Sequence, residues 1–355
     1  MDKLWWEKIT NANVFINMVV DTVLSEKSIV LVLPDYVPWC QKLYDTIETK
    51  ISKQNSKNSF DFINSPKENV GEFLLHKYCK EEKRVQYRPT KTYARFLAES
   101  DDIVLNDRYV WVQNIPENLF DGWVDFLSDY HKNMRKDVSP AVFILETNNE
   151  TLMRKTKRGI KKIVYDKQMN FFDTYTFCAL AVSGMSIKIH LKNYLAELVS
   201  NICGDDIELC AHCIKRGKQF LLNPLCVISD LKLKEFRSNG SNFEFVLDDE
   251  IIINKLIWKT QIKTIFPVIE DYRGEFIAKY RLDINKQLPI KNSNGEEFTE
   301  PEEVEIGTLH YMVVKDLFTV EEIQNNKLYQ FKKARNTLAH LKVLNLEEVD
   351  RILGE

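Results

Sequence analysis

Five short runs of apolar, mostly branched residues recur along the first half of the chain. They occupy residues 29–33, 60–63, 109–112, 141–146 and 161–165. Most of the sequence between them carries apolar residues at helical spacing, at 3–25, 39–51, 68–82, 90–99 and 119–132. Continuous runs of this length are typical of strands buried on both faces, and strands alternating with helices form parallel sheets. The pattern therefore predicts an α/β fold.

The order of these elements also resembles a known family. Helix, strand, loop, helix and strand are followed by further strand–helix repeats, as in the core of AAA+ and STAND-type P-loop ATPases. The resemblance covers roughly residues 20–170 and implies an ATPase-like α/β domain over residues 1–170. Residues 171–249 would then form a mainly helical lid or linker domain, and 250–355 an all-α bundle.

The phosphate-binding parts of that family pattern are missing. A P-loop needs glycine amides that cradle the phosphates and a lysine that reaches them. The segment after the first apolar run, Pro34–Trp39, has no glycine or lysine, and its two prolines have no N–H group. The third run ends without a carboxylate for magnesium, and the pair Gly217-Lys218 follows no strand pattern. We therefore predict a degenerate site, no ATP hydrolysis and no cofactor.

A second kind of doubly wound domain fits the same alternation. Flavodoxin-like or receiver-like domains also alternate strands and helices. A receiver needs an acidic cluster at strand ends, and Asp101-Asp102 precedes one predicted strand. This alternative stays open at the level of sequence.

Near the end of the chain, Arg335 and Asn336 are followed by His340 in a segment with helical spacing. An imidazole titrates near neutral pH and can move the proton of a ribose 2′-hydroxyl, whereas a guanidinium stays charged and binds phosphate. The spacing resembles the R-x4-H motif of HEPN domains, helical bundles of which many are metal-independent ribonucleases. The resemblance implies catalytic roles for Arg335, Asn336 and His340, with Lys332 and Lys333 extending an RNA-binding surface.

Structural roles explain the same residues equally well. Arg335 would then form an ion pair, Asn336 would bridge two helices and His340 would pack in a helix face. In a HEPN-type dimer the motif would line a groove whose other wall is a second helix or a second copy of the chain. Glu270 and Arg273 either line this groove or pair with each other, since they are three residues apart.

The seven cysteines suggest reduced thiols, because their number is odd and most are scattered. Cys210, His212 and Cys213 have ligand types and a spacing that zinc accepts. They also lie on an amphipathic helix predicted at 205–216, where buried cysteines behave as small apolar residues. A structural role is the stronger interpretation, and zinc the weaker one.

A net charge of −3 argues against a broad DNA- or RNA-binding surface, so any nucleic-acid contact would be local. No apolar run approaches the length of a membrane helix and no secretory signal is evident, which indicates a cytoplasmic protein. Trp123 and Trp258 are expected to anchor the cores of their domains.

Two functions follow from these observations. The first is a non-enzymatic regulatory or scaffold subunit that binds a protein partner or a second copy of itself. The second is a HEPN-type ribonuclease restrained by the N-terminal domain. An ATPase-like regulator joined to a HEPN-like domain resembles prokaryotic anti-phage defence and toxin modules, a setting that suits both.

Overall fold

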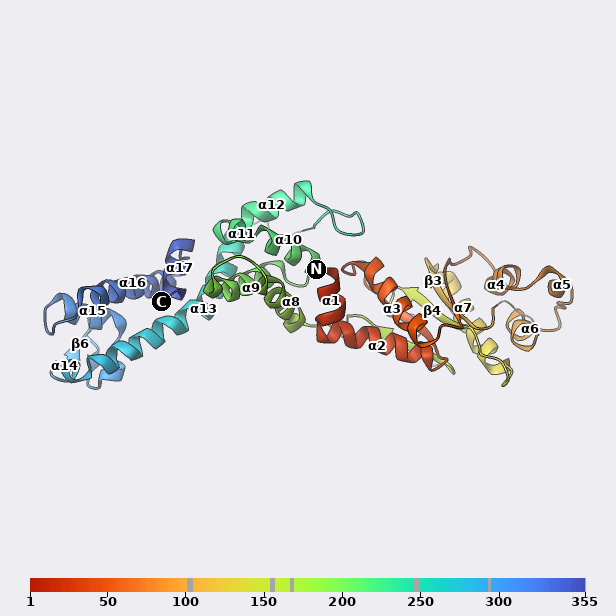
Figure 1. The fold of residues 1–355 in the computed structure, drawn as a ribbon, viewed down its shortest axis with the longest axis horizontal. Coiled ribbons are helices and arrows are strands. Elements are labelled where there is room, and N and C mark those ends of the chain that lie inside the picture. Colours follow the sequence, from red (N-terminus) through yellow and green to blue (C-terminus); the bar gives the residue numbers. More distant parts are fainter. Residues whose placement is uncertain (101–104, 154–156, 167–168, 245–249, 293–294, 355) are drawn as a thin grey trace. The chain divides into compact units, whose positions relative to one another are not determined.

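The computed structural model describes residues 1–100, 105–153, 157–166, 169–244, 250–292 and 295–354. The chain divides into two compact units, Met1–Asp173 and Thr174–Glu355, whose helices and strands are labelled in Figure 1. Among the described residues, no helix combines the length and apolarity needed to cross a membrane.

The first unit is built on a five-stranded parallel sheet. Its strands are β1 (Ser28–Val32), β2 (Ser59–Asn64), β3 (Arg108–Gln113), β4 (Val142–Thr147) and β5 (Ile160–Val164). They lie in the order β2-β3-β4-β1-β5, and every neighbouring pair is parallel. The predicted fold class, an α/β domain with a parallel sheet followed by a helical C-terminal region, is therefore confirmed.

The strand order decides between the two interpretations left open by the sequence. Flavodoxin-like and receiver domains have the order 2-1-3-4-5, in which the first strand lies beside the second. Here β1 lies between β4 and β5, so the receiver-like alternative is wrong. The order leaves the ATPase-like interpretation as the one that the parallel sheet still allows of the two. Asp101 and Asp102 lie outside the described residues.

Helices cover both faces of this sheet. They are α1 (Asp2–Lys8), α2 (Thr10–Leu24), α3 (Cys40–Gln54), α4 (Val70–Tyr78), α5 (Glu81–Arg84), α6 (Tyr93–Glu99) and α7 (Glu117–Asn133). Helices α2 and α3 pack on one face, whereas α4, α6 and α7 pack together on the other. The single helix predicted at 3–25 is in fact two, because Ile9 has extended backbone angles between α1 and α2.

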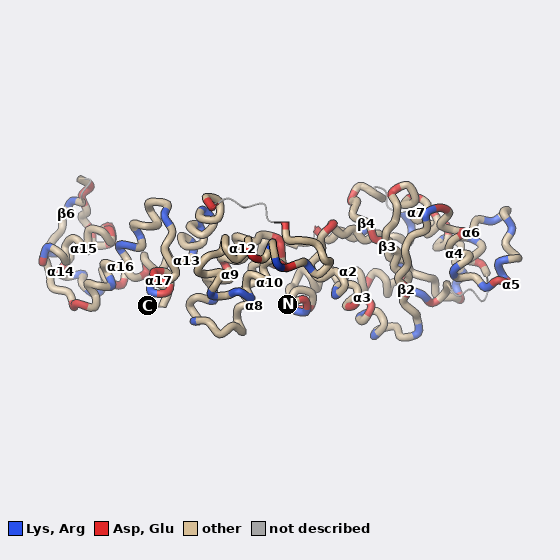
Figure 2. The backbone as a smooth tube through the Cα atoms, turned by 90° about the horizontal axis from the view of Figure 1, so that it is seen from above, with Lys and Arg blue, Asp and Glu red and all other residues tan. Residues whose placement is uncertain are grey.

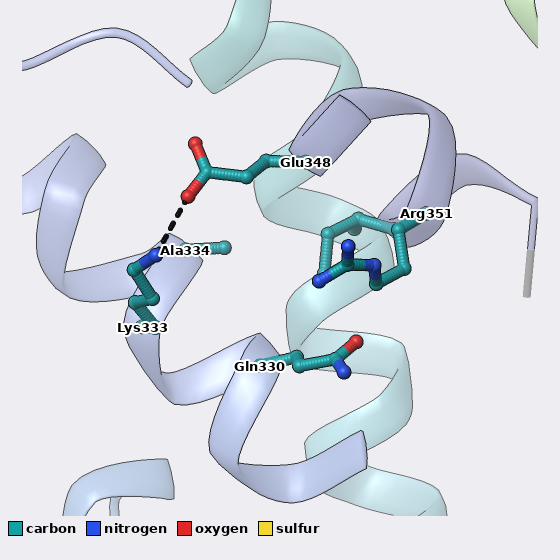
Figure 3. Close-up of a pocket in the computed structure, with 6 residues that line it drawn as sticks. Gln330, Lys333, Ala334, Glu348 and Arg351 are labelled. Atoms are coloured by element: carbon teal, nitrogen blue, oxygen red, sulfur yellow. Dashed lines mark hydrogen bonds and ion pairs between the residues drawn. The ribbon is translucent and has the colours of Figure 1, made fainter. Parts of the chain in front are cut away.

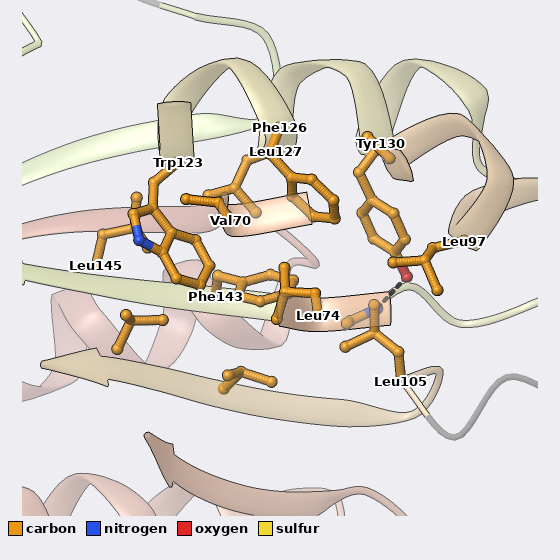
Figure 4. Packing of buried hydrophobic residues seen from close by; sticks show 14 of the residues in the cluster. Val70, Leu74, Leu97, Leu105, Trp123, Phe126, Leu127, Tyr130, Phe143 and Leu145 are labelled. Atoms are coloured by element: carbon orange, nitrogen blue, oxygen red, sulfur yellow. Dashed lines mark hydrogen bonds between the residues drawn. The ribbon is translucent and has the colours of Figure 1, made fainter. Parts of the chain in front are cut away.

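The core on the α7 face combines aliphatic side chains with the large aromatic rings of Trp123, Phe126, Tyr130 and Phe143 (Figure 4). Trp123 of α7 is fully buried, packs near Phe143 of β4 and donates its indole N–H to Ser65 Oγ at 2.9 Å. The Tyr130 hydroxyl accepts the amide of Ala141 at 3.1 Å and donates to Asn106 Oδ1 at 3.3 Å. The prediction that Trp123 anchors a core is confirmed.

The second unit is mainly helical. Its elements are α8 (Phe171–Ser183, which begins in the first unit), α9 (Ile189–Cys203), α10 (Ile207–Arg216), α11 (Lys218–Leu222), α12 (Pro224–Lys234), α13 (Glu250–Lys279), α14 (Arg281–Asn285), β6 (Ile290–Lys291), β7 (Glu297–Phe298), η1 (Pro301–Glu303), α15 (Ile306–Val314), α16 (Glu322–Ala339) and α17 (Leu346–Leu353). Helix α13 contacts α9 as well as α16 and α17. The finer division into domains 171–249 and 250–355 stays a prediction.

Helix α13 continues through Pro267 without interruption. Proline removes one helical hydrogen bond, and packing of α13 on several other helices offsets that loss. Helix α16 begins at Glu322 without a side-chain cap. The short strands β6 and β7 pair with each other in antiparallel fashion.

Candidate functional site

In open α/β sheets, ligands bind beyond the carboxyl ends of the strands where the strand order reverses. Here that place is the connection from β1 to α3, which an ATP phosphate would occupy in an active relative of the predicted kind. The connection contains buried Val37 and Pro38, and Trp39 takes a left-handed conformation at the start of α3. Trp39 provides no side-chain cap, and the two prolines provide no amide. The backbone donors that a phosphate requires are therefore scarce.

Aromatic side chains fill the surroundings of this connection. Trp6 of α1 is fully buried and donates its indole N–H to the carbonyl of Pro38 at 3.1 Å. Trp5 and Tyr165, which follows β5, pack around it with ring centroids 6.2 and 6.1 Å from Trp6. Burial raises the pKa of the Tyr165 hydroxyl far above its ordinary value. We call Trp5, Trp6 and Tyr165 the N-terminal aromatic cluster. The cluster makes the surroundings of the β1–α3 connection apolar, and a phosphate would be poorly solvated there.

A carboxylate of β4, Glu146, lies at the same edge of the sheet, as does Asp35 of the connection, which accepts from Asn148 at 2.7 Å. Glu146 of β4 accepts hydrogen bonds from the Tyr44 hydroxyl at 3.0 Å and the Trp111 indole at 2.7 Å. The Gln113 amide donates to it at 3.3 Å. A magnesium site needs several oxygen ligands, and the described residues contain no group of three histidines, cysteines or carboxylates arranged for a metal. Glu146 therefore has a structural role that joins β4, β3 and α3.

The second candidate site lies at the end of α16. Arg335 is about one-third exposed and contacts Glu305, the N-cap residue of α15, at 3.4 Å. Its other guanidinium nitrogen lies 3.4 Å from Asn336 Oδ1. Both distances are long for charged hydrogen bonds, so these contacts are weak. Within the described residues, Asn336 forms no side-chain bridge to a second helix, while the ion pair expected for Arg335 is present.

His340 is exposed at the C-cap of α16, so it does not pack in a helix face. The turn that carries it is fixed on both sides by α13. The Trp258 indole donates to the carbonyl of Leu338 at 2.8 Å. Gln261 accepts the amide of Leu344 at 2.8 Å and donates to its carbonyl at 2.9 Å. Trp258 itself is only partly buried, so the prediction that it is a core anchor is wrong; its role is to hold the end of α16.

The two lysines before Arg335 have protein partners. Lys332 donates to His310 Nδ1 at 3.3 Å, and Lys333 pairs with Glu348 of α17 at 2.9 Å (Figure 3). The cavity beside Lys333 measures about 30 Å³ and is closed by α16 and α17. It has room for about one water molecule, far from the several hundred Å³ of a typical ligand pocket. An RNA-binding role for Lys332 and Lys333 stays a prediction.

Arg273 and Glu270 pair with each other at 2.8 Å on α13. The Arg273 guanidinium also donates to the carbonyl of Glu302 at 2.8 Å, which attaches the segment before α15 to α13. These contacts agree with the structural alternative for both residues.

The proposed zinc ligands point in different directions. Cys210 and Cys213 are buried, whereas the His212 ring packs on Phe243 with centroids 5.2 Å apart. Cys213 lies beside Cys203, with 3.7 Å between the two sulfur atoms. Burial raises the pKa of the Cys203, Cys210 and Cys213 thiols. These buried, protonated thiols agree with the structural interpretation, in which the cysteines behave as small apolar residues.

Several important side chains were missed from the sequence. Glu146 ends an apolar run, and Trp6 and Gln261 lie in predicted helices. Each acts through a partner distant in the chain, and such pairings leave no local pattern. The only available signal was that two adjacent tryptophans, Trp5 and Trp6, are costly to leave exposed.

Comparisons with known proteins add little to this description. No family model matches the chain, and none of the curated proteins matches it. Among solved structures, the chain is similar to the ORC2 protein of Aeropyrum pernix, solved as ADPNP–ADP complexes. The identity is 12%, the coverage 96% of this chain and 92% of that chain, and the TM-score 0.33. A likeness at this level carries no information on ligands or chemistry.

Proposed function

We propose that the protein is a non-enzymatic scaffold or regulatory subunit whose ATPase-like domain does not bind nucleotide. The observation that carries the proposal is the hydrogen bond from the buried Trp6 indole to the Pro38 carbonyl. It attaches α1 to the connection that a phosphate would otherwise approach. Glu146, the carboxylate of β4 at this edge, is already bound by three donors.

A domain of this kind retains its use as a rigid platform. Its sheet and covering helices form a continuous core, which holds surface residues at fixed positions for a protein partner or a second copy of the chain. A role in a prokaryotic defence or toxin module rests on the resemblance of the two domain types and is part of this proposal.

Thermal unfolding with and without nucleotides tests the proposal. A ligand that binds only the folded state at a hundred times its Kd stabilises it by about 2.7 kcal/mol. We expect no change of Tm with millimolar ATP, ADP or GTP and magnesium. A rise of several degrees with one nucleotide would refute the closed site.

A second function is favoured by one specific observation at α16. His340 is exposed on a turn that α13 holds at both ends, and the Arg335 guanidinium is also accessible to solvent. An accessible imidazole and an accessible guanidinium at the end of one helix supply the residue types that metal-independent RNA cleavage uses. A second copy of the chain would supply the other wall of the groove that binds the RNA.

Cleavage of RNA in EDTA tests this candidate. The wild-type protein is compared with His340→Ala and with His76→Ala, an exposed histidine of the first unit that serves as the control. Ribonuclease activity requires cleavage by the wild type and the control and its loss in His340→Ala. Equal cleavage by all three proteins would point to a contaminating nuclease and dismiss the assignment.

A further inference from the structure

A basic hollow lies at the amino-terminal end of the sheet, at the opposite end of β1 from the Pro34–Trp39 connection. Its volume is about 590 Å³. The described residues that line it are Lys27, Met153, Lys157, Gly159, Ile160, Lys161 and Lys162. Four of these are lysines, and no carboxylate is among them. We call this surface, together with the exposed neighbour Arg158, the basic hollow.

The fold brings these cations together from two separate segments. Lys27 directly precedes β1, and Lys157 and Arg158 precede β5. The two strand starts are joined because the amide of Ser28 donates to the carbonyl of Gly159 at 2.9 Å. Gly159 has φ +76°, and a Cβ atom there would lie 3.1 Å from the His131 ring, so this position favours glycine.

The hollow concentrates positive charge in a chain that is acidic overall. Lys and Arg occupy six of the nine positions 154–162, whereas the net charge of the chain is −3. Elsewhere Figure 2 shows blue basic and red acidic segments distributed among each other over the chain. Lys157 forms an exposed ion pair with Asp125 at 3.2 Å, which neutralises only part of the local charge.

One lysine of the hollow also fixes its wall. Lys162 donates to the carbonyl of Leu152 at 2.9 Å and to the carbonyl of Glu150. This contact holds the chain after β4 against β5. Lys27, Arg158 and Lys161 are exposed at the surface. The hollow thus combines a fixed wall with accessible cationic side chains.

We propose that the basic hollow binds the phosphate backbone of a nucleic acid without reading its sequence. Ammonium groups bind phosphates as point charges, and no aromatic ring or side-chain amide lines the hollow to recognise bases. An acidic protein is a poorer match. Protein interfaces depend on central aromatic or large apolar anchors, and the lining offers only Met153 and Ile160 for these. This inference is independent of whether the opposite end of β1 binds nucleotide.

Fluorescence anisotropy with the full-length protein and a short labelled duplex DNA or single-stranded RNA tests the proposal. The triple variant Lys27→Gln, Arg158→Gln, Lys161→Gln removes three accessible cations. The control Lys53→Gln, Lys57→Gln, Lys67→Gln removes three exposed lysines elsewhere in the first unit. At low salt we expect the hollow variant to bind about tenfold or more weakly than the control, because each phosphate contact releases counterions. The slope of log Kd against log salt should fall by about 3.

Three outcomes would overturn the proposal. The first is no binding of either nucleic acid by the wild type at low salt. The second is an equal loss of affinity in the hollow variant and the control. The third is binding of polyglutamate as tight as that of the nucleic acids and equally sensitive to the hollow variant, which would assign the surface to an acidic protein. Circular dichroism of both variants confirms that each is folded.

Discussion

The two ends of strand β1 have opposite surroundings. At its carboxyl end the backbone enters a connection with two prolines, and the buried Trp6 indole is bonded to the Pro38 carbonyl. At its amino end, Lys27 and the start of β5 border an open hollow lined by lysines. We therefore propose that the first environment disfavours a phosphate and that the second attracts one.

On the proposed function, the fold is kept while the phosphate site expected for it is lost. The parallel sheet depends on buried runs such as Ile29–Val32 and on the packing of α7, neither of which involves the site. The residues at the strand ends are free to change independently. The experiments below test this separation, from the largest expected effect to the smallest.

Replacing Trp123 by alanine should have the largest effect, because both ends of β1 rest on the same core. The side chain is fully buried against Phe143. We expect the free energy of unfolding of the first unit to fall by about 3–5 kcal/mol. Phe172→Ala is the control, since Phe172 is 76% exposed and should change stability little. Similar urea midpoints for both variants would contradict the placement of the core.

Trp6→Phe should destabilise specifically the Pro34–Trp39 connection at the carboxyl end of β1. The substitution keeps an aromatic ring but leaves the Pro38 carbonyl without its indole donor. An unsatisfied buried acceptor costs about 1–3 kcal/mol. Urea unfolding measures the loss, and nucleic-acid binding at the basic hollow should remain unchanged. Wild-type stability in this variant would show that the bond does not close the connection.

At the amino end of β1, His131 should make the stability of the first unit depend on pH. Burial lowers the pKa of this histidine below 6.5, and its Nε2 lies 2.9 Å from Ser28 Oγ. Ser28 Oγ already accepts the Phe143 amide, so its hydrogen is directed to a neutral ring. As the pH decreases below 6.5, His131 takes up a proton in the unfolded chain but stays neutral in the folded chain. The free energy of unfolding therefore decreases as the pH decreases. The loss ends once the pH passes below the folded-state pKa.

Comparison of the wild type with His131→Asn isolates this contribution. The wild type should lose stability below pH 6.5 with an additional slope of at most about 1.4 kcal/mol per pH unit. The variant is expected to be less stable near neutral pH, where the Ser28 contact is intact in the wild type. Parallel pH profiles of the two proteins would exclude this role for His131.

His340→Ala should have the smallest effect on stability. Its side chain is exposed, and the turn is held by Trp258 and Gln261 through backbone groups of Leu338 and Leu344. We expect a change within about 0.5 kcal/mol. Gln261→Ala removes the contacts to Leu344 and should cost about 1–3 kcal/mol by comparison. A large effect of His340→Ala would mean that the imidazole itself supports the fold.

The sheet was predictable because its signals are local. Each of the five apolar runs became a strand with boundaries shifted by one residue or so, as for β1 at Ser28–Val32. The start of helix α17 is likewise fixed by local residues, since Asn345 and Glu348 form a reciprocal capping box there. Strand order was not predictable, since it depends on which strands pair across long connections.

The candidate sites were less predictable than the fold. The absence of glycine and lysine after β1 indicated a lost phosphate site, but not that Trp6 would bond to Pro38. Similarly, Arg335 and His340 were recognisable by their residue types. The hydrogen bonds of Trp258 to Leu338 and of Gln261 to Leu344 were not, because each joins residues about 80 positions apart in the chain. Continuity of α13 through Pro267 likewise reflects packing that outweighs a local preference.

Calorimetric titration of ATP with magnesium into the full-length protein tests the central claim most directly. The closed connection at the carboxyl end of β1 predicts no saturable heat at micromolar protein concentrations. The same protein sample should still bind nucleic acid at the basic hollow, which shows that it is folded and competent. Saturable, magnesium-dependent binding of ATP with a micromolar Kd would contradict the account.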